Sequence, residues 1–276
     1  MAWRALMTLL VVAVVVLGLL WGLQRRLVYF PDNAPVPSAA SVLPGGRDVA
    51  LRTADGLTLG AWFFPPVGAS RDVAVLVAPG NGGNRAGRLG LAQELRQRGF
   101  AVLLMDYRGY GGNPGSPSEA GLADDADAAV VALRELGYPA ARTIYLGESL
   151  GTGVVAALQQ RQPPAGMVLR SPFTELADVA AHHYPWLPVR ALLRDRFPVA
   201  PLVASSQVPT VVIAGSRDSI VPAELSAQVA DAAGALATEV VLEGADHNDP
   251  VMVGAAVADA VARLADEAVT QPPARG

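Results

Sequence analysis

Short apolar runs alternate with longer stretches of helical pattern along most of this chain, and this alternation constrains its fold more than any other feature. The runs are rich in valine, leucine and isoleucine, as expected for strands that are buried on both faces. Strands of this kind, separated by helices, predict a mostly parallel sheet with helices on both sides. The expected strands lie near residues 73–77, 101–105, 143–146, 166–170, 209–214 and 238–242.

The predicted domain boundaries follow from changes in composition along the 276 residues. Residues 49–53 and 58–64 are predicted to form a hairpin with its turn at Asp55 and Gly56. This hairpin opens a single α/β domain with a sizeable core. The divisions we expect are an N-terminal anchor at 1–26, a Pro/Ala/Ser-rich linker at 27–46, a domain at 47–268 with an insertion at about 174–205, and a tail at 269–276.

Ser149 lies in the most informative local motif, the Gly-Glu-Ser-Leu-Gly sequence of residues 147–151. The motif joins a predicted strand to a predicted helix, which is the setting of a nucleophile elbow. A sharp turn there would present the serine hydroxyl to a base and direct the Leu150 N–H toward a developing oxyanion. The bare pattern also fits an ordinary glycine-rich turn. Its context makes Ser149 our candidate nucleophile.

Two further residues follow Ser149 in the chain order Ser, Asp, His, each just after a predicted strand. Asp218 follows the strand near residues 209–214, and His247 follows the strand near 238–242. This order is one of those in which catalytic triads occur. The chain has only three histidines, and the other two are adjacent and precede Asp218. We therefore interpret His247 as the general base and Asp218 as the acid that orients it.

Asp246 and Asp249 are alternative orienting acids because they lie close to His247 in sequence. Asp249 precedes Pro250 and an Ala/Val-rich periodic segment, a pattern typical of a helix N-cap with proline at the first helical position. Asp246 would have to curl back onto its own neighbour. Asp218 remains the predicted acid.

A glycine-rich loop at residues 79–84 follows the strand near 73–77. Loops of this kind expose backbone N–H groups that can complete an oxyanion hole. We expect the Asn81 N–H to act in this way, together with the Leu150 N–H. The same glycines do not match the spacings of the nucleotide-binding loops, so a phosphate site is not expected.

These motifs together resemble the α/β-hydrolase superfamily, and within it the membrane-anchored, serine aminopeptidase-like branch of esterases and depalmitoylase relatives. The resemblance covers roughly residues 27–267, and it is carried by Leu-Val-Tyr-Phe-Pro at 27–31, Gly-Asn-Gly-Gly-Asn at 80–84, Asp-Tyr-Arg-Gly-Tyr-Gly at 106–111 and the motifs around Ser149, Asp218 and His247. It implies an α/β-hydrolase fold and acyl-ester chemistry. Relatives usually carry His-Gly-Asn in the oxyanion loop, whereas this chain has Pro79, which puts the geometry of that loop in question.

Composition excludes several other classes of function. The net charge of −4 provides no basic stripe for nucleic acid. The absence of cysteine rules out disulfides and thiolate metal sites, and three histidines without HExxH spacing argue against a catalytic zinc ion. We expect no cofactor and no metal.

The N-terminus carries a second strong signal, because residues 5–23 contain no charge and are almost all apolar. Their length approaches the roughly 20 residues that cross a bilayer. No small-residue cleavage site follows, and Trp3 and Trp21 are placed like interfacial aromatics. We predict a single-pass anchor, in a bacterial inner membrane. Arg4 precedes the span and Arg25 and Arg26 follow it, which leaves the orientation open.

An insertion at about residues 174–205 carries aromatics and prolines. It fits either a cap over the site or an ordinary helical excursion whose Trp186, Leu187 and Leu193 pack on the sheet. A pocket beneath a cap with Tyr184 and Phe197 would be mostly apolar and would favour uncharged acyl groups. Asp106 and Arg108 follow the strand near residues 101–105 and are interpreted as a structural ion pair that fixes the loop.

Three functions from different classes remain. The first is a membrane-anchored serine hydrolase acting on small-molecule or lipid-like esters or thioesters. The second is a peptidase of the same fold, which would need an acidic pocket for a substrate α-amine. The third is a non-catalytic scaffold, which would be expected to lack a triad member, and none is missing from this sequence. A dehalogenase is disfavoured because the elbow carries Ser149 rather than an aspartate.

Overall fold

The computed structural model describes residues 2–270 and contains an eight-stranded sheet in the order β10-β9-β8-β7-β4-β6-β3-β2. The strands from β10 to β6 run parallel, while β2 and β3 form the antiparallel edge. The predicted strands and hairpin are confirmed. Their bounds are β2 Arg47–Arg52, β3 Thr58–Phe64, β4 Ala74–Ala78, β6 Ala101–Met105, β7 Thr143–Glu148, β8 Gly166–Arg170, β9 Thr210–Gly215 and β10 Leu236–Leu242.

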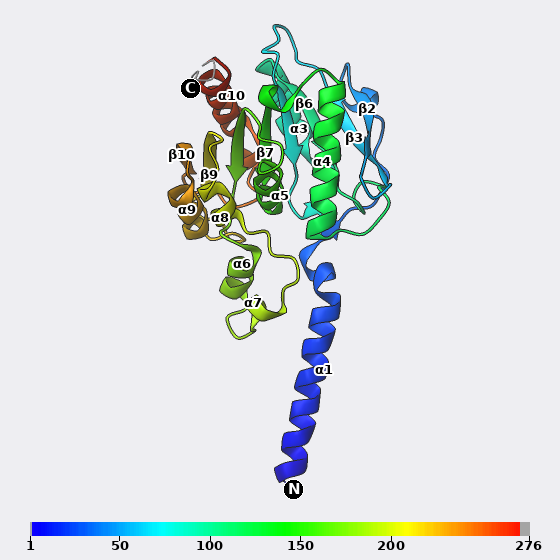
Figure 1. Cartoon of the computed structure of the whole chain (residues 1–276), viewed down its shortest axis with the longest axis vertical. Coiled ribbons are helices and arrows are strands. Elements are labelled where there is room, and N and C mark those ends of the chain that lie inside the picture. Colours follow the sequence, from blue (N-terminus) through cyan, green and yellow to red (C-terminus); the bar gives the residue numbers. More distant parts are fainter. Residues whose placement is uncertain (1, 271–276) are drawn as a thin grey trace.

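Helices cover both faces of the sheet, as Figure 1 shows. Side chains alternate across β4, so that Val75 and Val77 belong to one core cluster and Leu76 belongs to the other. The first cluster packs against α3 (Leu89–Gln97) and α10 (Ala255–Thr270). The second packs against α4 Glu119–Glu135, α5 Leu150–Leu158, α8 Val199–Ala204 and α9 Ala223–Ala232. This double covering explains why the central strands are continuously apolar.

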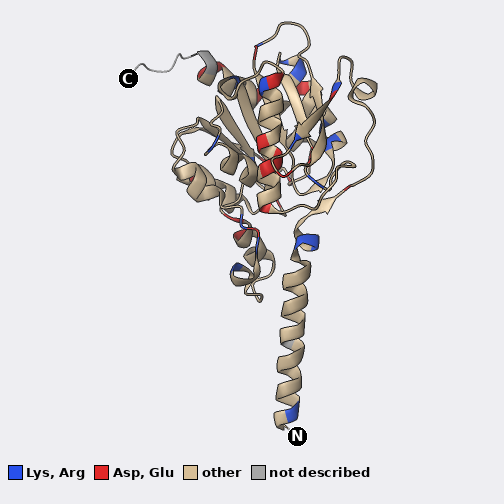
Figure 2. Cartoon of the chain, turned by 45° about the vertical axis from the view of Figure 1, so that its right-hand side comes forward, with Lys and Arg blue, Asp and Glu red and all other residues tan. Residues whose placement is uncertain are grey.

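The N-terminal helix α1 (Ala2–Val28) projects from the domain as a single rod (Figure 1). It is long and apolar enough to cross a membrane, with a mean hydropathy of 2.7 over a window that is 0% buried. Such a window is not the core helix of a soluble domain. Figure 2 shows basic residues only near the two ends of this helix. The helix continues two residues beyond the predicted end of the anchor.

The segment predicted as a linker carries two short elements. β1 (Phe30–Pro31) pairs in parallel with β5 (Gly82–Gly83), which belongs to the glycine-rich loop. Further on, α2 (Ala39–Val42) buries Ala39 completely. The chain that leaves α1 is therefore held against the domain. The predicted tail at 269–276 lies mostly outside the described residues.

The insertion between β8 and β9 divides into two parts with different environments. Its first part contains α6 (Leu176–His183) and α7 (Val189–Leu192), which lie beside the domain end of α1 (Figure 1). Its last part, including α8, packs into the core. Trp186 is 75% exposed and does not pack on the sheet. Phe197 is buried instead of lining a pocket, because its ring packs where a side chain at Gly153 would otherwise lie.

Asp106 and Arg108 form ion pairs, but not with each other. Asp106 accepts a hydrogen bond from Arg85 at 2.6 Å, and burial raises the pKa of its carboxyl to about 6 despite that pairing. Arg108 bonds to Asp125 at 2.8 Å and to Asp55 at 2.7 Å. These contacts hold the loop after β6 to α4 and to the turn of the hairpin. Short 3₁₀ turns, η1 Arg85–Arg88, η2 Ala140–Arg142 and η3 Pro250–Val253, complete the described chain.

Candidate active site

Ser149 occupies a strained turn between β7 and α5. Its backbone has φ of 50° and ψ of −116°, a left-handed conformation that non-glycine residues rarely adopt. Strain of this kind persists only where the surrounding structure imposes it, and it is common at active sites. The Ser149 side chain is thereby held at the carboxyl edge of the sheet.

The two glycines of the motif are required by close backbone approaches. A Cβ atom at Gly151 would lie 2.1 Å from the carbonyl oxygen of Ala78 in β4. A Cβ atom at Gly147 would lie 2.6 Å from the carbonyl oxygen of Gly151. Any larger residue at either position would force α5 away from the sheet, so the spacing around Ser149 follows from packing.

Asp218 and His247 are brought together by the ends of β9 and β10. The His247 Nδ1 atom lies 2.7 Å from the Asp218 Oδ2 atom, and both side chains are buried. The other Asp218 oxygen accepts N–H bonds from Ile220 and Val221 at 3.0 and 2.7 Å. These bonds fix the carboxylate, so that it holds the imidazole in one orientation.

The electrostatics of this pair favour an ionised acid. Burial alone would raise the pKa of Asp218, but the hydrogen bond and the charge of His247 outweigh it, with help from the Val221 N–H. The pKa of Asp218 therefore lies below its ordinary value. A carboxylate at this position stabilises an imidazolium during proton transfer.

Neither alternative aspartate hydrogen-bonds to the imidazole within the described chain. Asp246 accepts backbone N–H bonds from Ser219 and His247, both at 2.7 Å. Asp249 occupies the N-cap position before Pro250, as predicted, but its side chain accepts from the Asp246 N–H at 2.8 Å instead of capping the turn. Both residues shape the histidine loop.

Ser149 and His247 face one cavity of about 340 Å³ at the carboxyl edge of the sheet. No hydrogen bond joins the Ser149 hydroxyl to the imidazole within the described chain. Such bonds often form only when substrate is bound. The cavity is lined by Gly80, Asn81, Gly82, Gly87, Arg88, Glu148, Ser149, Arg170, Ile220, His247, Asn248 and Val253.

Asn81 and Leu150 lie next to Ser149 with their backbone N–H groups available. Leu150 is the first residue of α5, where N–H groups have no intrahelical acceptor. The Asn81 N–H makes no hydrogen bond within residues 2–270, although the rest of Asn81 is firmly held. Its carbonyl accepts from the Phe30 N–H and the Tyr110 hydroxyl, each at 2.8 Å, and its amide donates to the Val28 carbonyl at 2.7 Å.

Comparison with known proteins supports the fold described above. The family model described as serine aminopeptidase, S33, matches residues 69–202. The uncharacterized protein Rv2307c of Mycobacterium tuberculosis (strain ATCC 25618 / H37Rv) is 52% identical over 245 residues, which cover 87% of each chain. This chain belongs to the α/β-hydrolase superfamily.

Other members of the superfamily are similar to this hydrolase over part or most of its length. Lysophosphatidylserine lipase ABHD12 of Danio rerio is 29% identical over 66% of this chain and 57% of its own. The esterase Pf2001 of Pyrococcus furiosus shares the fold, with a TM-score of 0.70 at 19% identity, over 88% of this hydrolase and 100% of its own chain. The family model supports a hydrolase, and the esterase shows a shared fold alone.

The hydrolase also carries a buried charge cluster that the sequence analysis missed. Glu148 is fully buried and pairs with Arg88 at 3.1 Å and with Arg170 at 3.6 Å. Arg170 in turn donates to the His247 carbonyl at 2.8 Å. Burial alone would raise the pKa of Glu148, but the two arginines together lower it. The only sequence signal was the position of Glu148 and Arg170 at the carboxyl ends of neighbouring strands.

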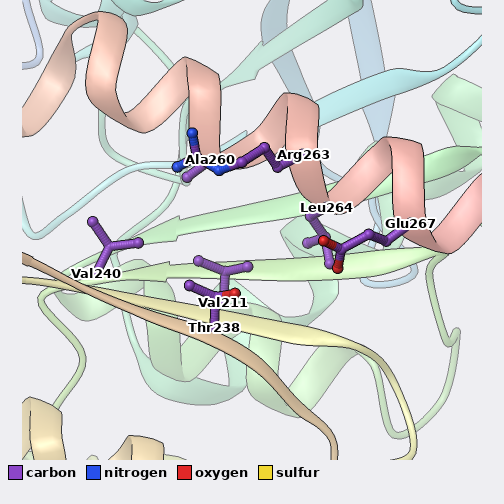
Figure 3. A pocket seen from close by; sticks show the side chains of 7 residues that line it. All are labelled: Val211, Thr238, Val240, Ala260, Arg263, Leu264 and Glu267. Atoms are coloured by element: carbon purple, nitrogen blue, oxygen red, sulfur yellow. The ribbon is translucent and has the colours of Figure 1, made fainter.

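Two other features of the hydrolase bear on ligands. Within residues 2–270, no three His, Asp or Glu side chains gather as a metal site would require. A crevice of about 30 Å³ lies between β9, β10 and α10, lined by residues such as Val211 and Leu264 (Figure 3). That volume suits one or two water molecules and excludes a substrate.

Proposed function

We propose that this protein is a membrane-anchored serine hydrolase that cleaves carboxylic esters or thioesters through an acyl-enzyme on Ser149. The single observation that carries the proposal is the strained Ser149 facing one cavity with His247, whose Nδ1 atom lies 2.7 Å from Asp218. This arrangement supplies a nucleophile, a base and an orienting acid.

In the proposed mechanism the Ser149 hydroxyl attacks the ester carbonyl while His247 Nε2 takes its proton. The Asp218 carboxylate stabilises the resulting imidazolium and holds its tautomer. The N–H groups of Asn81 and Leu150 bind the oxyanion of the tetrahedral intermediate. The imidazolium then protonates the leaving alcohol or thiol. Water, deprotonated by His247, releases the acid and restores Ser149.

The contacts of Asn81 also bear on Pro79, which replaces the histidine of the relatives. The carbonyl of Pro79 accepts a hydrogen bond from the Tyr107 hydroxyl at 2.9 Å. Together with the bonds of Asn81 to Val28, Phe30 and Tyr110, this contact holds the loop without an imidazole. We propose that a framework of backbone acceptors keeps the oxyanion loop in position.

An ester substrate is favoured over a peptide with a free α-amine. An aminopeptidase needs an acidic group that is free to pair with that amine. The acidic side chain that lines the cavity with Ser149 is Glu148, and it already pairs with Arg88 and Arg170. The relatives named as esterases and as a lipase support the same choice.

Contacts between α1 and the insertion support an anchor that is retained after synthesis. Arg25 forms an ion pair with Asp195 at 3.1 Å, and the Tyr29 hydroxyl donates to the same carboxylate at 3.0 Å. Gln24 donates to the Leu192 carbonyl at 3.1 Å. Cleavage of α1 as a signal peptide would discard the contacts of Gln24 and Arg25.

Labelling with a fluorophosphonate probe, followed by turnover assays, tests the proposal. Wild-type protein should react with the probe and hydrolyse p-nitrophenyl esters, and Ser149→Ala should do neither. Aminoacyl p-nitroanilides should be poor substrates. Labelling that persists in Ser149→Ala would overturn the nucleophile, and faster cleavage of the anilides would favour the peptidase. A chain that neither labels nor turns over any substrate would support the scaffold.

A further inference from the structure

A second, larger cavity lies between α1 and the insertion and plays no part in the mechanism above. Its volume is about 420 Å³, within the roughly 300–1,000 Å³ typical of small-molecule sites. One wall comes from the last turns of α1, including Leu20 and Leu27. The other comes from α7 and the chain around it, including Leu187 and Leu193. We call this cavity the anchor groove.

The anchor groove presents an apolar surface with no charged side chain among its lining residues. Gln24 lines it, but its amide is fully engaged. The Gln24 nitrogen donates to the carbonyls of Trp21 and Leu192, and its oxygen accepts from the Arg194 N–H at 2.7 Å. Apart from the Tyr184 hydroxyl and the Trp186 N–H at its mouth, a ligand in the groove therefore meets mainly hydrocarbon, which suits an alkyl chain.

Polar contacts at its margin hold the groove open in advance of any ligand. Arg25 and Tyr29 converge on the buried carboxylate of Asp195, and Arg194 stacks over the Trp21 ring at 4.9 Å. These contacts join α1 to a part of the chain far away in sequence. A preformed groove requires little ordering when a ligand enters.

The position of the groove indicates the source of its ligand. Its first wall continues directly into the uncharged face of α1, where a bilayer would place lipid chains. Tyr184 and Trp186 stand at its mouth, 52% and 75% exposed, and amphipathic rings of this type favour the membrane interface. An occupant can thus pass from a bilayer into the groove along α1.

The groove is joined to the cavity that contains Ser149 through two of its lining residues. Val28 and Phe30 line it, and their backbone groups bond to Asn81, which lines the cavity that contains Ser149. Resting on the proposed function, we infer that the anchor groove binds the acyl chain of a membrane-lipid ester while its carbonyl reaches Ser149. The substrate class is then a long-chain acyl ester drawn from the bilayer.

The test compares p-nitrophenyl esters from acetate to palmitate with the full-length protein in lipid nanodiscs. In the wild type, kcat/KM should rise by up to about fourfold per methylene until the groove is filled. Leu193→Trp should fill the groove and lower kcat/KM for the longest esters by at least about tenfold, with acetate unchanged. Leu193→Ala should move the optimum to longer chains. Val131→Trp, on an exposed surface of α4, is the matched control and should change nothing.

A binding measurement separates this inference from the proposed function. A fluorescent fatty acid should bind Ser149→Ala, and adding Leu193→Trp should weaken that binding by about tenfold. Ser149-dependent hydrolysis with no response of chain-length preference to Leu193 substitutions would overturn the groove and leave the hydrolase standing. Absence of Ser149-dependent hydrolysis would overturn the proposed function, while the binding result would still decide the groove. Equal effects of Leu193→Trp and Val131→Trp on chain-length preference would also overturn the proposed role of the anchor groove.

Discussion

The cavity around Ser149 and the anchor groove differ in how they are built. The first is polar and is assembled at the carboxyl ends of parallel strands, where Asn81, Ser149, Asp218 and His247 follow β4, β7, β9 and β10 in turn. The groove is apolar and is assembled from α1 and an insertion. The strand ends thus position the residues of the proposed triad, and elements outside the sheet surround the apolar cavity. Because different elements build them, changes in one should leave the other largely intact.

The largest expected effect is the loss of catalysis when Ser149 is replaced, with the anchor groove left intact. Ser149→Ala should lower kcat by about 10⁴-fold or more for every acyl chain length, since a triad acts as a unit. Steady-state assays on short and long esters check this. If the loss were confined to long chains, Ser149 would be a binding residue and the two regions would not be separate.

Asp218→Asn should come next, with a loss of roughly 10⁴-fold because the amide presents the wrong partner to the imidazole. Asp246→Asn is the matched control, since the Asp246 carboxylate accepts from the backbone N–H of His247 and not from its ring. It should cost much less. A larger loss at Asp246 than at Asp218, measured as kcat/KM on one ester, would reverse the assignment of the acid.

Glu148→Gln tests the buried cluster beneath the polar cavity. Removing the charge leaves Arg88 and Arg170 without their shared partner, which should lower the free energy of unfolding by about 3 kcal/mol. The pKa of Glu148 is lowered in the folded state, so this stabilisation is present above its ordinary value of 4.5 and is lost as pH falls through the folded pKa.

Denaturant unfolding of wild type and Glu148→Gln at several pH values checks the direction of this pH dependence of stability. The difference between the two proteins should be full near pH 7 and should vanish in acid. A difference that stayed constant down to the lowest pH would mean that the charge of Glu148 contributes nothing. Glu94→Gln is a control, because that carboxylate is partly exposed in an i,i+4 pair and should change stability by well under 1 kcal/mol.

Deleting residues 1–26 should have the smallest effect on chemistry. Full-length protein should stay with membranes after a carbonate wash, whereas the shortened chain should be soluble and keep its kcat/KM on acetate within a few-fold. Preference for long chains should fall, because one wall of the groove is gone. Deletion through residue 31 should damage even acetate hydrolysis, since it removes the Val28 and Phe30 bonds to Asn81. If the two deletions hydrolysed acetate equally well, the bonds of Val28 and Phe30 to Asn81 would not be needed for activity.

Sequence reasoning predicted the strands closely because buried parallel strands carry their signal locally. Each is a short apolar run bounded by turn residues, and the expected strand near residues 101–105 is found at Ala101–Met105. The strained turn at Ser149 was predicted in the same way, since two glycines at fixed spacing report a close approach within a few residues.

Apart from the pairing of Asp218 with His247, contacts between distant segments were not predicted. The pairing of β1 with the oxyanion loop and the ion pair of Arg25 with Asp195 join residues that share no local pattern. Phe197 was expected in a pocket because aromatics in an insertion suit a cap, but it is buried in the core against Gly153. A side chain's hydrophobicity predicts burial, not the partner that buries it.

The sequence by itself determined the sheet, its helical covering, the apolar N-terminal helix and the chain order of Ser149, Asp218 and His247, because periodicity and turn chemistry act over a few residues. The tertiary structure decided how Glu148 is paired, how the oxyanion loop is held and where an apolar groove forms. Those outcomes depend on the order and register of strands and on the docking of α1. Packing between distant segments sets these outcomes, and no local sequence pattern encodes that packing.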